Sequence, residues 1–293
     1  MTFFTSPSFA RARRIVLRVL ALLLLLSCFV RVGVAAVSRR RAQKAEGLSL
    51  YVLDVGQGDA ILLRANGETL LVDCGPFSAE SQLRVILHDL GVQKLDYFLV
   101  THPHEDHYGN ARTVLSEFTP GQVILPAETG SEEAYLLFVS ELKQKGTTAV
   151  TAQTGMCFSF GGAEAEVLLS GFGQGNNGST VLCVTYGETT VLLTGDLEKE
   201  GEAALLSSCP QKLSCNLLKV GHHGSDSSGS PEFLAAAAPR MAAISCGAGN
   251  SYGLPDVGTL SRLSALECRI YRTDLSGTLI FYSDGRTLTC RSE

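Results

Sequence analysis

Three histidines and two carboxylates are crowded into the six residues His102-Pro103-His104-Glu105-Asp106-His107. This hexapeptide follows the apolar run 95–100 after one residue, so it begins where a buried strand is expected to end. Imidazole nitrogens and carboxylate oxygens are the ligands that suit zinc and its neighbours. His102 and His104, two residues apart in extended backbone, would point the same way and bind one ion. Asp106 and His107 would bind a second ion. The chain must therefore fold so that a strand ends at a metal site.

Five of the chain's six histidines fall into two clusters, which favours a metal site over ordinary solvated positions. The first cluster is 102–107. The second is the pair His222-His223, which follows another apolar run. One member of this pair is expected to bind metal, and the other to donate a proton or contact the substrate; the sequence does not decide which. The sixth histidine, His88, lies in a helix-like stretch and is expected to be a surface or packing residue.

Asp196 is a further candidate ligand because it follows a strand-like apolar run, 191–193, through Thr194-Gly195. Its carboxylate would emerge where that strand ends. The alternative role is that of a turn aspartate capping the helix that begins near Glu198.

The pattern of the remaining segments predicts a layered α+β sandwich. Short β-branched or apolar runs indicate an antiparallel meander, with Asn66-Gly67 as a hairpin turn. Amphipathic stretches indicate helices, and Gly91 and Gly146 stand where helices should stop. The predicted strands are 48–55, 60–64, 70–73, 167–170, 181–186 and 190–194, and the predicted helices are 79–90, 108–118, 131–145 and 198–207.

The hexapeptide, taken with four further motifs, resembles the metallo-β-lactamase superfamily. The likeness covers about residues 48–282 and is greatest to the branch that holds the hydrolase domain of ComEC-type DNA-uptake proteins and their stand-alone relatives. It implies a four-layer αββα sandwich with metals at one rim between the sheets. The further motifs are Asp54-Val55-Gly56-Gln57-Gly58-Asp59-Ala60, Leu71-Val72-Asp73-Cys74-Gly75, Leu193-Thr194-Gly195-Asp196 and Lys219-Val220-Gly221-His222-His223-Gly224-Ser225.

The resemblance also implies roles for individual residues. Two divalent ions would be bridged by Asp196, and a metal-bound hydroxide would attack the substrate, so no serine or cysteine nucleophile is required. Asp106, His222 and His223 would take part in catalysis. The residues implied to lie behind the ligands and orient them are Asp59, Asp73, Asn177 and Ser179. The implied ligands are His102, His104, Asp106, His107, Asp196 and one of His222 and His223.

The sequence departs from the family pattern in two places. No histidine lies between His107 and His222, where many members supply another ligand to the first metal; an Asn- and Ser-containing segment, 175–179, stands there instead. Zinc is the expected metal, and manganese is the alternative because it accepts oxygen ligands more readily. In a later loop of the branch, two histidines are replaced here by Leu254 and Asp256, so a substrate contact is expected to be absent.

Residues 1–46 are expected to form a separate unit. The apolar stretch 15–37 is long enough to span a bilayer if Arg18 and Arg31 reach the interfaces. The unit is predicted to be a transmembrane or signal helix, with 47–293 forming one hydrolase domain. The protein would then be membrane-anchored, with the hydrolase domain outside the cytoplasm; the alternative is a secreted protein or a lipoprotein.

The charge balance of 47–293 argues against a surface that grips long DNA. Residues 1–46 hold nine of the 24 Lys and Arg and one of the 29 Asp and Glu, which leaves 15 basic and 28 acidic residues, a net charge of −13. Binding to a phosphate backbone usually requires a basic patch. A small phosphodiester or a single-strand end could still bind at the metals. No protein partner is evident.

These observations predict a dinuclear metal-dependent hydrolase, with a phosphodiesterase or nuclease as the leading function. A second hypothesis keeps the site but assigns a lactone, thioester or amide as the substrate. A third is a non-catalytic binding module that retains metal for stability. The replacement at Leu254 favours the third hypothesis, whereas the complete hexapeptide and Asp196 weigh against it.

Overall fold

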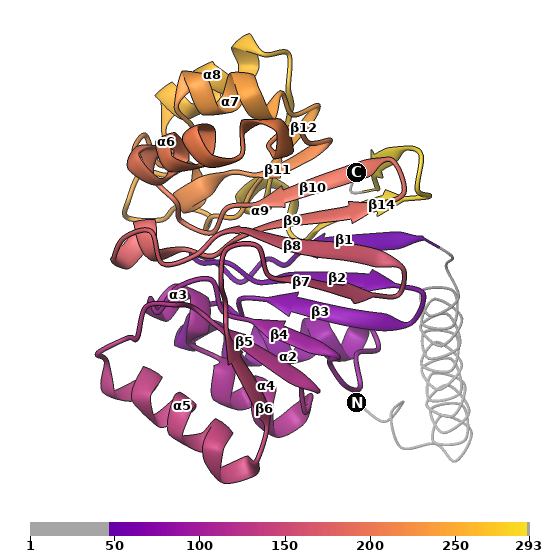
Figure 1. Ribbon diagram of the computed structural model, residues 1–293, viewed down its shortest axis with the longest axis vertical. Helices are drawn as coiled ribbons and strands as arrows, with labels where there is room; N and C mark the ends of the chain where they lie inside the picture. Colours follow the sequence, from indigo (N-terminus) through magenta and orange to yellow (C-terminus); the bar gives the residue numbers. More distant parts are fainter. Residues whose placement is uncertain (1–46, 292–293) are drawn as a thin grey trace, which may run out of the picture. The chain divides into compact units, whose positions relative to one another are not determined.

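The computed structural model describes residues 47–291. Two mixed β-sheets face each other at the centre, and helices cover the outer face of each sheet (Figure 1). This arrangement confirms the predicted α+β sandwich, in which each sheet buries one face against the other sheet and one face against helices.

The first sheet has eight strands. It begins with an antiparallel meander, continues with three strands parallel to its third strand, and is completed by the last two strands of the chain, which pair beside the first strand. The predicted hairpin turn is confirmed, because Asn66 and Gly67 both have positive φ. In order across the sheet, the strands are β15 (Leu288–Cys290), β14 (Leu279–Ser283), β1 (Leu48–Val52), β2 (Ile61–Ala65), β3 (Glu68–Val72), β4 (Tyr97–Leu99), β5 (Gln122–Leu125) and β6 (Thr148–Thr151).

The second sheet has seven strands. Its first four strands along the chain are antiparallel neighbours, and the last three continue in parallel from the fourth. The predicted strands 167–170, 181–186 and 190–194 fall within this antiparallel part. In order across the sheet, the strands are β13 (Arg269–Arg272), β12 (Met241–Ile244), β11 (Leu217–Lys219), β10 (Thr189–Leu193), β9 (Val181–Tyr186), β8 (Ala163–Leu169) and β7 (Cys157–Phe160).

The helices form the two outer layers. One set packs on the first sheet, where Phe98 of β4 meets Phe138 with ring centroids 6.3 Å apart, and the other set packs on the second sheet (Figure 1). Gly146 ends the longest described helix in the left-handed conformation, as predicted. The first set is α2 (Glu80–Asp89), α4 (Ala111–Glu117) and α5 (Glu133–Lys145), and the second is α6 (Lys199–Ser208), α7 (Pro231–Ala237) and α8 (Val257–Ala265).

The core follows from the two-residue period of the strands. In β10, Val191 and Leu193 belong to the apolar cluster between the sheets, whereas Leu192 belongs to a second cluster beneath α6, α7 and α8. Leu217 and Leu218 of β11 divide in the same way. Strands that are apolar at every position are therefore buried on both faces.

The predicted helix 108–118 begins earlier than expected and is divided in two. The short helix α3 (Glu105–Tyr108) starts inside the hexapeptide, and α4 follows after a break at Asn110. The Asn110 side chain donates hydrogen bonds to the carbonyl oxygens of Cys74 and Pro76, at 2.8 and 2.7 Å. The Asn110 side chain therefore connects the end of α3 to the segment that follows β3.

The predicted membrane or signal helix lies within 1–46, outside the described residues, and stays a prediction. Within 47–291, no helix combines the length and apolar character needed to cross a bilayer. His88 lies on the surface of α2, where its ring packs against Phe118 with centroids 5.2 Å apart, in agreement with the role expected for it.

Candidate metal centre

The predicted ligands reach one rim of the sandwich because each of them follows the end of a strand. The hexapeptide leaves β4 and enters α3. Asp196 follows β10 in a turn, and the pair His222-His223 follows β11 in the 3₁₀ turn η4 (Gly221–Gly224). Since β10 and β11 are parallel neighbours, their ends lie side by side.

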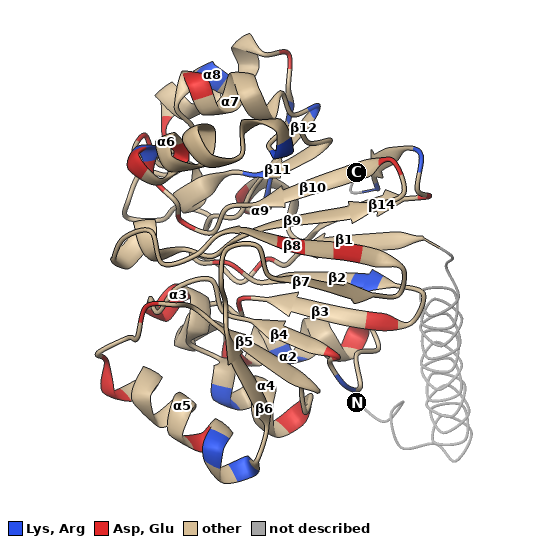
Figure 2. Ribbon diagram, in the orientation of Figure 1, with Lys and Arg blue, Asp and Glu red and all other residues tan. Residues whose placement is uncertain are grey.

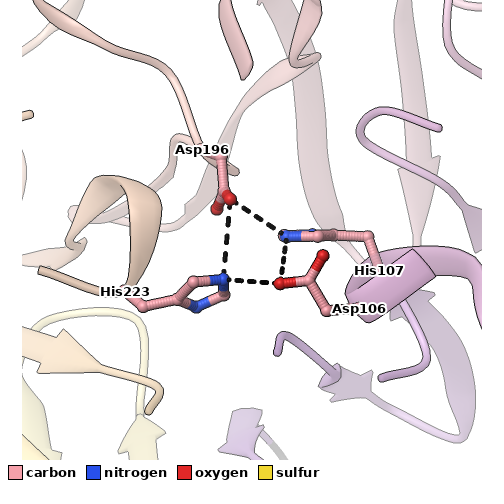
Figure 3. Close-up of side chains that lie close together, drawn as sticks. All are labelled: Asp106, His107, Asp196 and His223. Carbon is pink, nitrogen blue, oxygen red and sulfur yellow. Dashed lines mark hydrogen bonds and ion pairs between the residues drawn. The ribbon is translucent and has the colours of Figure 1, made fainter. Parts of the chain in front are cut away.

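Four side chains bring one ligand atom each to within 4.8 Å of one another: Asp106, His107, Asp196 and His223 (Figure 3). Asp196 Oδ2 lies 3.3 Å from Nε2 of His107 and 3.5 Å from Nε2 of His223. Asp106 Oδ2 lies 3.1 Å from Nε2 of His223. Asp106 and His107 come from the side of the first sheet, and Asp196 and His223 from the side of the second.

His102 and His104 form a second group at the same aspartate. His102 Nε2 lies 3.0 Å from Nδ1 of His104 and 3.9 Å from Oδ2 of Asp196. The His102 ring is fully buried, whereas His104 lines a cavity. Asp196 Oδ2 is therefore shared by both groups, which is the position that a bridging carboxylate would take.

The hydrogen bonds behind the imidazoles turn Nε2 of His107 and of His223 toward the centre. Nδ1 of His107 lies 2.7 Å from Asp73 Oδ2, and Nδ1 of His223 lies 3.0 Å from the carbonyl oxygen of Ser245. Asp73 also accepts hydrogen bonds from the backbone N–H and the hydroxyl of Thr101. Such partners fix the tautomer and orientation of an imidazole that binds metal.

The donor set fits a divalent metal ion. Among the described residues, the buried atoms without a hydrogen-bond partner include Nε2 of His107 and Oδ1 of Asp196, both of which belong to the cluster. Buried polar atoms are normally satisfied, so unsatisfied ones call for an explanation such as an ion. Two imidazole nitrogens and two carboxylates are a donor set that zinc accepts.

The imidazoles at this site differ in their protonation. Burial and the nearby His107 hold the pKa of His102 well below its usual range, so His102 is neutral. Burial alone would lower the pKa of His223, but the charge of Asp196 and the hydrogen bonds to Asp106 and Asp59 outweigh it and raise that pKa to about 10. The pKa of His107 is also raised, chiefly by Asp196 and Asp73 against the effect of burial. Protons on His107 and His223 thus compensate the carboxylates.

Metal binding is expected to release these protons. At pH 7 the metal must displace one proton from His107 and one from His223, about two in all, because imidazole binds metal in its neutral form. The raised pKa values stabilise the folded metal-free protein below pH 6.5, and this contribution is lost as the pH rises toward about 10. Zinc titration calorimetry in buffers of different ionisation enthalpy measures the release; an enthalpy independent of buffer would contradict it.

A buried ion pair lies directly behind His223. Lys219 Nζ lies 2.8 Å from Oδ2 of Asp59, and both side chains are 1 % exposed. Oδ1 of Asp59 in turn lies 3.3 Å from Nδ1 of His223. Nothing local to Lys219 or Asp59 in the sequence signals this pairing.

Asp59 and Asp73 could themselves form a group with His107, since their ligand atoms also lie within 4.8 Å of one another. Both carboxylates already have protein partners, however: Asp59 pairs with Lys219, and Asp73 accepts from Thr101. Both carboxylates therefore lie behind the candidate ligands. Gly58 allows the loop that carries Asp59 to approach Asp106, because a Cβ at Gly58 would collide with the main chain of Asp106.

His222 and His223 are separated by an unusual backbone. Both residues adopt left-handed conformations, with φ of 46° and 52°. This directs His223 into the buried cluster and leaves His222 partly exposed, with Nε2 3.9 Å from Asp196 Oδ2. Nδ1 of His222 lies 3.0 Å from the hydroxyl of Ser227 and 3.3 Å from Glu198. The geometry thus favours His223 as the ligand and His222 as the residue that faces the substrate.

The left-handed turn should carry measurable strain. Because glycine adopts positive φ without a steric penalty, we expect the His222→Gly variant to be more stable than His222→Ala by about 1 kcal/mol. Urea unfolding of both variants measures the difference. Equal stability, or a more stable alanine variant, would mean that the turn is not strained.

The segment that replaces the family's additional histidine has two supporting roles. The Ser179 hydroxyl lies 3.3 Å from Nδ1 of His102 and accepts a hydrogen bond from the backbone N–H of Asp196, so it holds both. Asn177 lies further out: its side-chain oxygen accepts from the backbone N–H groups of Glu198 and Gly201 at the start of α6. The helix is therefore capped by Asn177, and Asp196 is free to face the cluster.

Comparison with known families agrees with this geometry. Residues 53–247 match the family described as the metallo-beta-lactamase superfamily. The chain belongs to the metallo-β-lactamase superfamily. The family predicted from the motifs is thereby confirmed, and members of this superfamily bind divalent metals with clusters of histidine and aspartate of the kind described above.

Two relatives of this metallo-β-lactamase superfamily chain are considerably longer proteins. The chain is 30% identical over 259 residues to ComE operon protein 3 of Bacillus subtilis, covering 81% of the chain and 33% of that protein. It is 32% identical over 263 residues to competence protein ComA of Neisseria gonorrhoeae, covering 88% of the chain and 35% of that protein. The chain thus spans about a third of the length of these relatives.

Solved structures share the superfamily fold. The metallo-beta-lactamase fold protein YhfI from Bacillus subtilis aligns with a TM-score of 0.55 and 15% identity, over 78% of this chain and 97% of that one. CmlA, a diiron beta-hydroxylase from Streptomyces venezuelae, aligns with a TM-score of 0.57 and 16% identity, over 82% of this chain and 55% of that one. At such identities the likeness concerns the fold alone.

A cavity of about 590 Å³ opens over the cluster of this superfamily member. Five ligand candidates line it, together with parts of the two loops that depart from the family pattern, Asn176 in one and Leu254 in the other; the five are His104, Asp106, Asp196, His222 and His223. Leu254, which stands in place of a histidine, lines the cavity. Asp256, which replaces the other, caps α8 by accepting a hydrogen bond from the backbone N–H of Gly258. Of the two replacements, Leu254 is the one that changes the cavity wall.

Proposed function

We propose that the protein is a metal-dependent phosphodiesterase with two divalent ions at this centre. The proposal rests chiefly on one observation: Oδ2 of Asp196 lies 3.9 Å from Nε2 of His102 in one group, and 3.3 and 3.5 Å from Nε2 of His107 and of His223 in the other. One ion would be held by His102 and His104. The other would be held by Asp106, His107 and His223. Asp196 would bind both ions. Zinc is the expected metal and manganese the alternative, since the first group has only two imidazoles.

In the proposed reaction, the oxygen of water adds to phosphorus, the bond from phosphorus to one ester oxygen breaks, and that oxygen leaves as an alcohol after taking a proton. The other product is a phosphomonoester. Bound ions would acidify the water and stabilise the charge on the phosphoryl oxygens. His222 would supply the proton from Nε2, because its Nδ1 is held by Ser227 and the ring lines the cavity. Asp73 and Ser245 would keep the two buried imidazoles in place.

The choice of a phosphodiester over other substrates is supported by the relatives. One relative is named competence protein ComA, and another, from Haemophilus influenzae, recombination protein 2. Both terms concern nucleic acid, whose backbone is a phosphodiester. The chain covers only about a third of those proteins, so the activity is proposed for this domain and no uptake role is carried over.

Hydrolysis of bis-p-nitrophenyl phosphate by the full-length chain tests the proposal. We expect turnover after zinc or manganese is added to chelator-treated protein. With dithymidine phosphate, whose alcohol leaving group must take a proton, we expect His222→Gln to lose about 10²-fold in kcat through the missing proton donor. Metal content is measured in parallel. Two bound ions without phosphodiester turnover would overturn the proposal in favour of a lactone, thioester or amide substrate, and protein that binds no metal would overturn any enzymatic role.

A further inference from the structure

An exposed aromatic side chain stands at the rim of the cavity. Tyr252 is 73 % exposed, more than Phe77 or Phe172, and it lines the cavity together with Leu254 and the ligand candidate His223. An exposed ring of this size gains no burial energy in the unbound protein. Its place above the proposed reaction centre points to contact with a substrate.

The loop that carries Tyr252 is held in place by side chains. Asn250 accepts hydrogen bonds at Oδ1 from the backbone N–H groups of Tyr252 and Leu254, both at 3.1 Å. Its Nδ2 donates to the carbonyl oxygens of Gly247 and Leu254. The backbone N–H of Asp256 donates to the carbonyl oxygen of Gly224, at 2.9 Å, which joins the loop to the turn that bears His223. The backbone at Tyr252 is therefore fixed relative to the metal centre.

The charges around the cavity limit the length of the substrate. Among the described residues that line it, none is Lys or Arg. Figure 2 shows acidic positions on α3, while basic positions are scattered on outer helices such as α5 and α8. A long nucleic acid needs several cations along its backbone. Here, only a phosphate at the metal ions would meet positive charge, and the cavity volume is that of a small-molecule site.

We propose that the substrate is a small nucleotide-sized phosphodiester whose base stacks on Tyr252, an inference that rests on the proposed phosphodiesterase activity. The scissile phosphate lies at the metal centre, and the base lies over the tyrosine ring at the cavity rim. Leu254 adds an apolar contact where a histidine would otherwise offer a hydrogen bond. Base stacking accepts any base, so the site selects for the presence of a base and for short length rather than for sequence.

Two esters with the same leaving group test the stacking. The metal-loaded full-length chain is assayed with thymidine 5′-(p-nitrophenyl phosphate) and with methyl p-nitrophenyl phosphate. We expect kcat/KM to favour the thymidine ester by about tenfold, the size of one stacked base. In Tyr252→Ala this ratio should fall to about one, and Tyr252→Phe should restore it because phenylalanine keeps the ring.

The dependence on length and salt tests the second half of the proposal. Dithymidine phosphate should be hydrolysed at least as fast per phosphodiester as long single-stranded DNA. Its kcat/KM should change by less than about threefold between roughly 50 and 200 mM salt, whereas a protein with many phosphate contacts loses about 10³-fold or more over that range.

The outcomes separate this inference from the proposed function. If neither ester is hydrolysed, both the proposed function and this inference are wrong. Turnover of both esters with a ratio near one, or with a ratio that survives Tyr252→Ala, overturns the stacking role alone. Faster cleavage of long DNA with a steep salt dependence overturns the small substrate and favours a nuclease.

Discussion

Replacing Asp196 with Asn is expected to abolish metal binding and hydrolysis together. The amide keeps the size of the side chain but removes the charge that faces four imidazoles. Because the metals would supply several kcal/mol of transition-state stabilisation, kcat/KM for bis-p-nitrophenyl phosphate should fall by at least about 10³-fold. Zinc at about 100 times its Kd should stabilise the native protein by about 2.7 kcal/mol and leave the variant unchanged.

Glu141→Gln is the matched control for charge. Glu141 lies on the outer layer, in α5, where it pairs with Arg112 at 2.8 Å, and the substitution also removes one negative charge without loss of volume. This variant should keep its metal content, its activity and the stabilisation by zinc. If Asp196→Asn retained two ions and native turnover, the central role of Asp196 would be wrong.

Replacing Lys219 with Met should destabilise the protein by about 3–5 kcal/mol, since it leaves the carboxylate of Asp59 buried without its cation. Burial alone would raise the pKa of Asp59, but Lys219 and His223 outweigh this effect and hold the pKa below its ordinary value. The contribution of Asp59 to stability is therefore present above pH 3.8 and is lost as the pH falls. Urea unfolding at neutral and acidic pH measures both effects.

Two further variants isolate the buried pair. The double variant Asp59→Asn with Lys219→Met removes both charges and should recover most of the lost stability. Lys212→Met is the exposed control, because Lys212 pairs with Glu166 and both of those side chains are partly exposed. Its free energy of unfolding should change by no more than about 1 kcal/mol. A double variant as unstable as Lys219→Met would mean that packing, not charge, accounts for the loss.

The candidate ligands could be predicted from the sequence because each one follows a short apolar run. A strand that ends at a sheet rim delivers the next polar residues to that rim, whatever the rest of the fold does. This holds for the hexapeptide after β4, for Asp196 after β10 and for the histidine pair after β11. The supporting role of Asp73 came from the family motif.

Other features depend on contacts that no local pattern contains. The assignment of His223 rather than His222 to the cluster follows from two consecutive left-handed residues, which the sequence disfavours at both positions. The pairing of Lys219 with Asp59 joins strand β11 of the second sheet to the loop between β1 and β2 of the first. Both arrangements arise only once the sheets have packed together.

Two of the elements that the sequence patterns did not predict illustrate different reasons. Strand β6 is an edge strand whose residues are mostly exposed, so it shows no alternation of apolar and polar side chains. Helix α7 did carry a signal: Ser230 caps it by accepting from the backbone N–H of Phe233, and Pro231 follows at its first position. A search for caps as well as for periodicity would have found it.

The return of the last strands to the first sheet bears on how this domain can be joined to other proteins. Leu48 at the start of β1 pairs with Ser283 of β14, which pairs with Leu288 of β15. Because β15 ends at Cys290, opposite Phe281 of β14, the chain leaves the domain two strand spacings across the sheet and two residues along it from where it enters, a separation of about 12 Å. A host protein could accept the domain as an insertion without moving its own parts apart, and a linker of about four residues could close the domain into a circle.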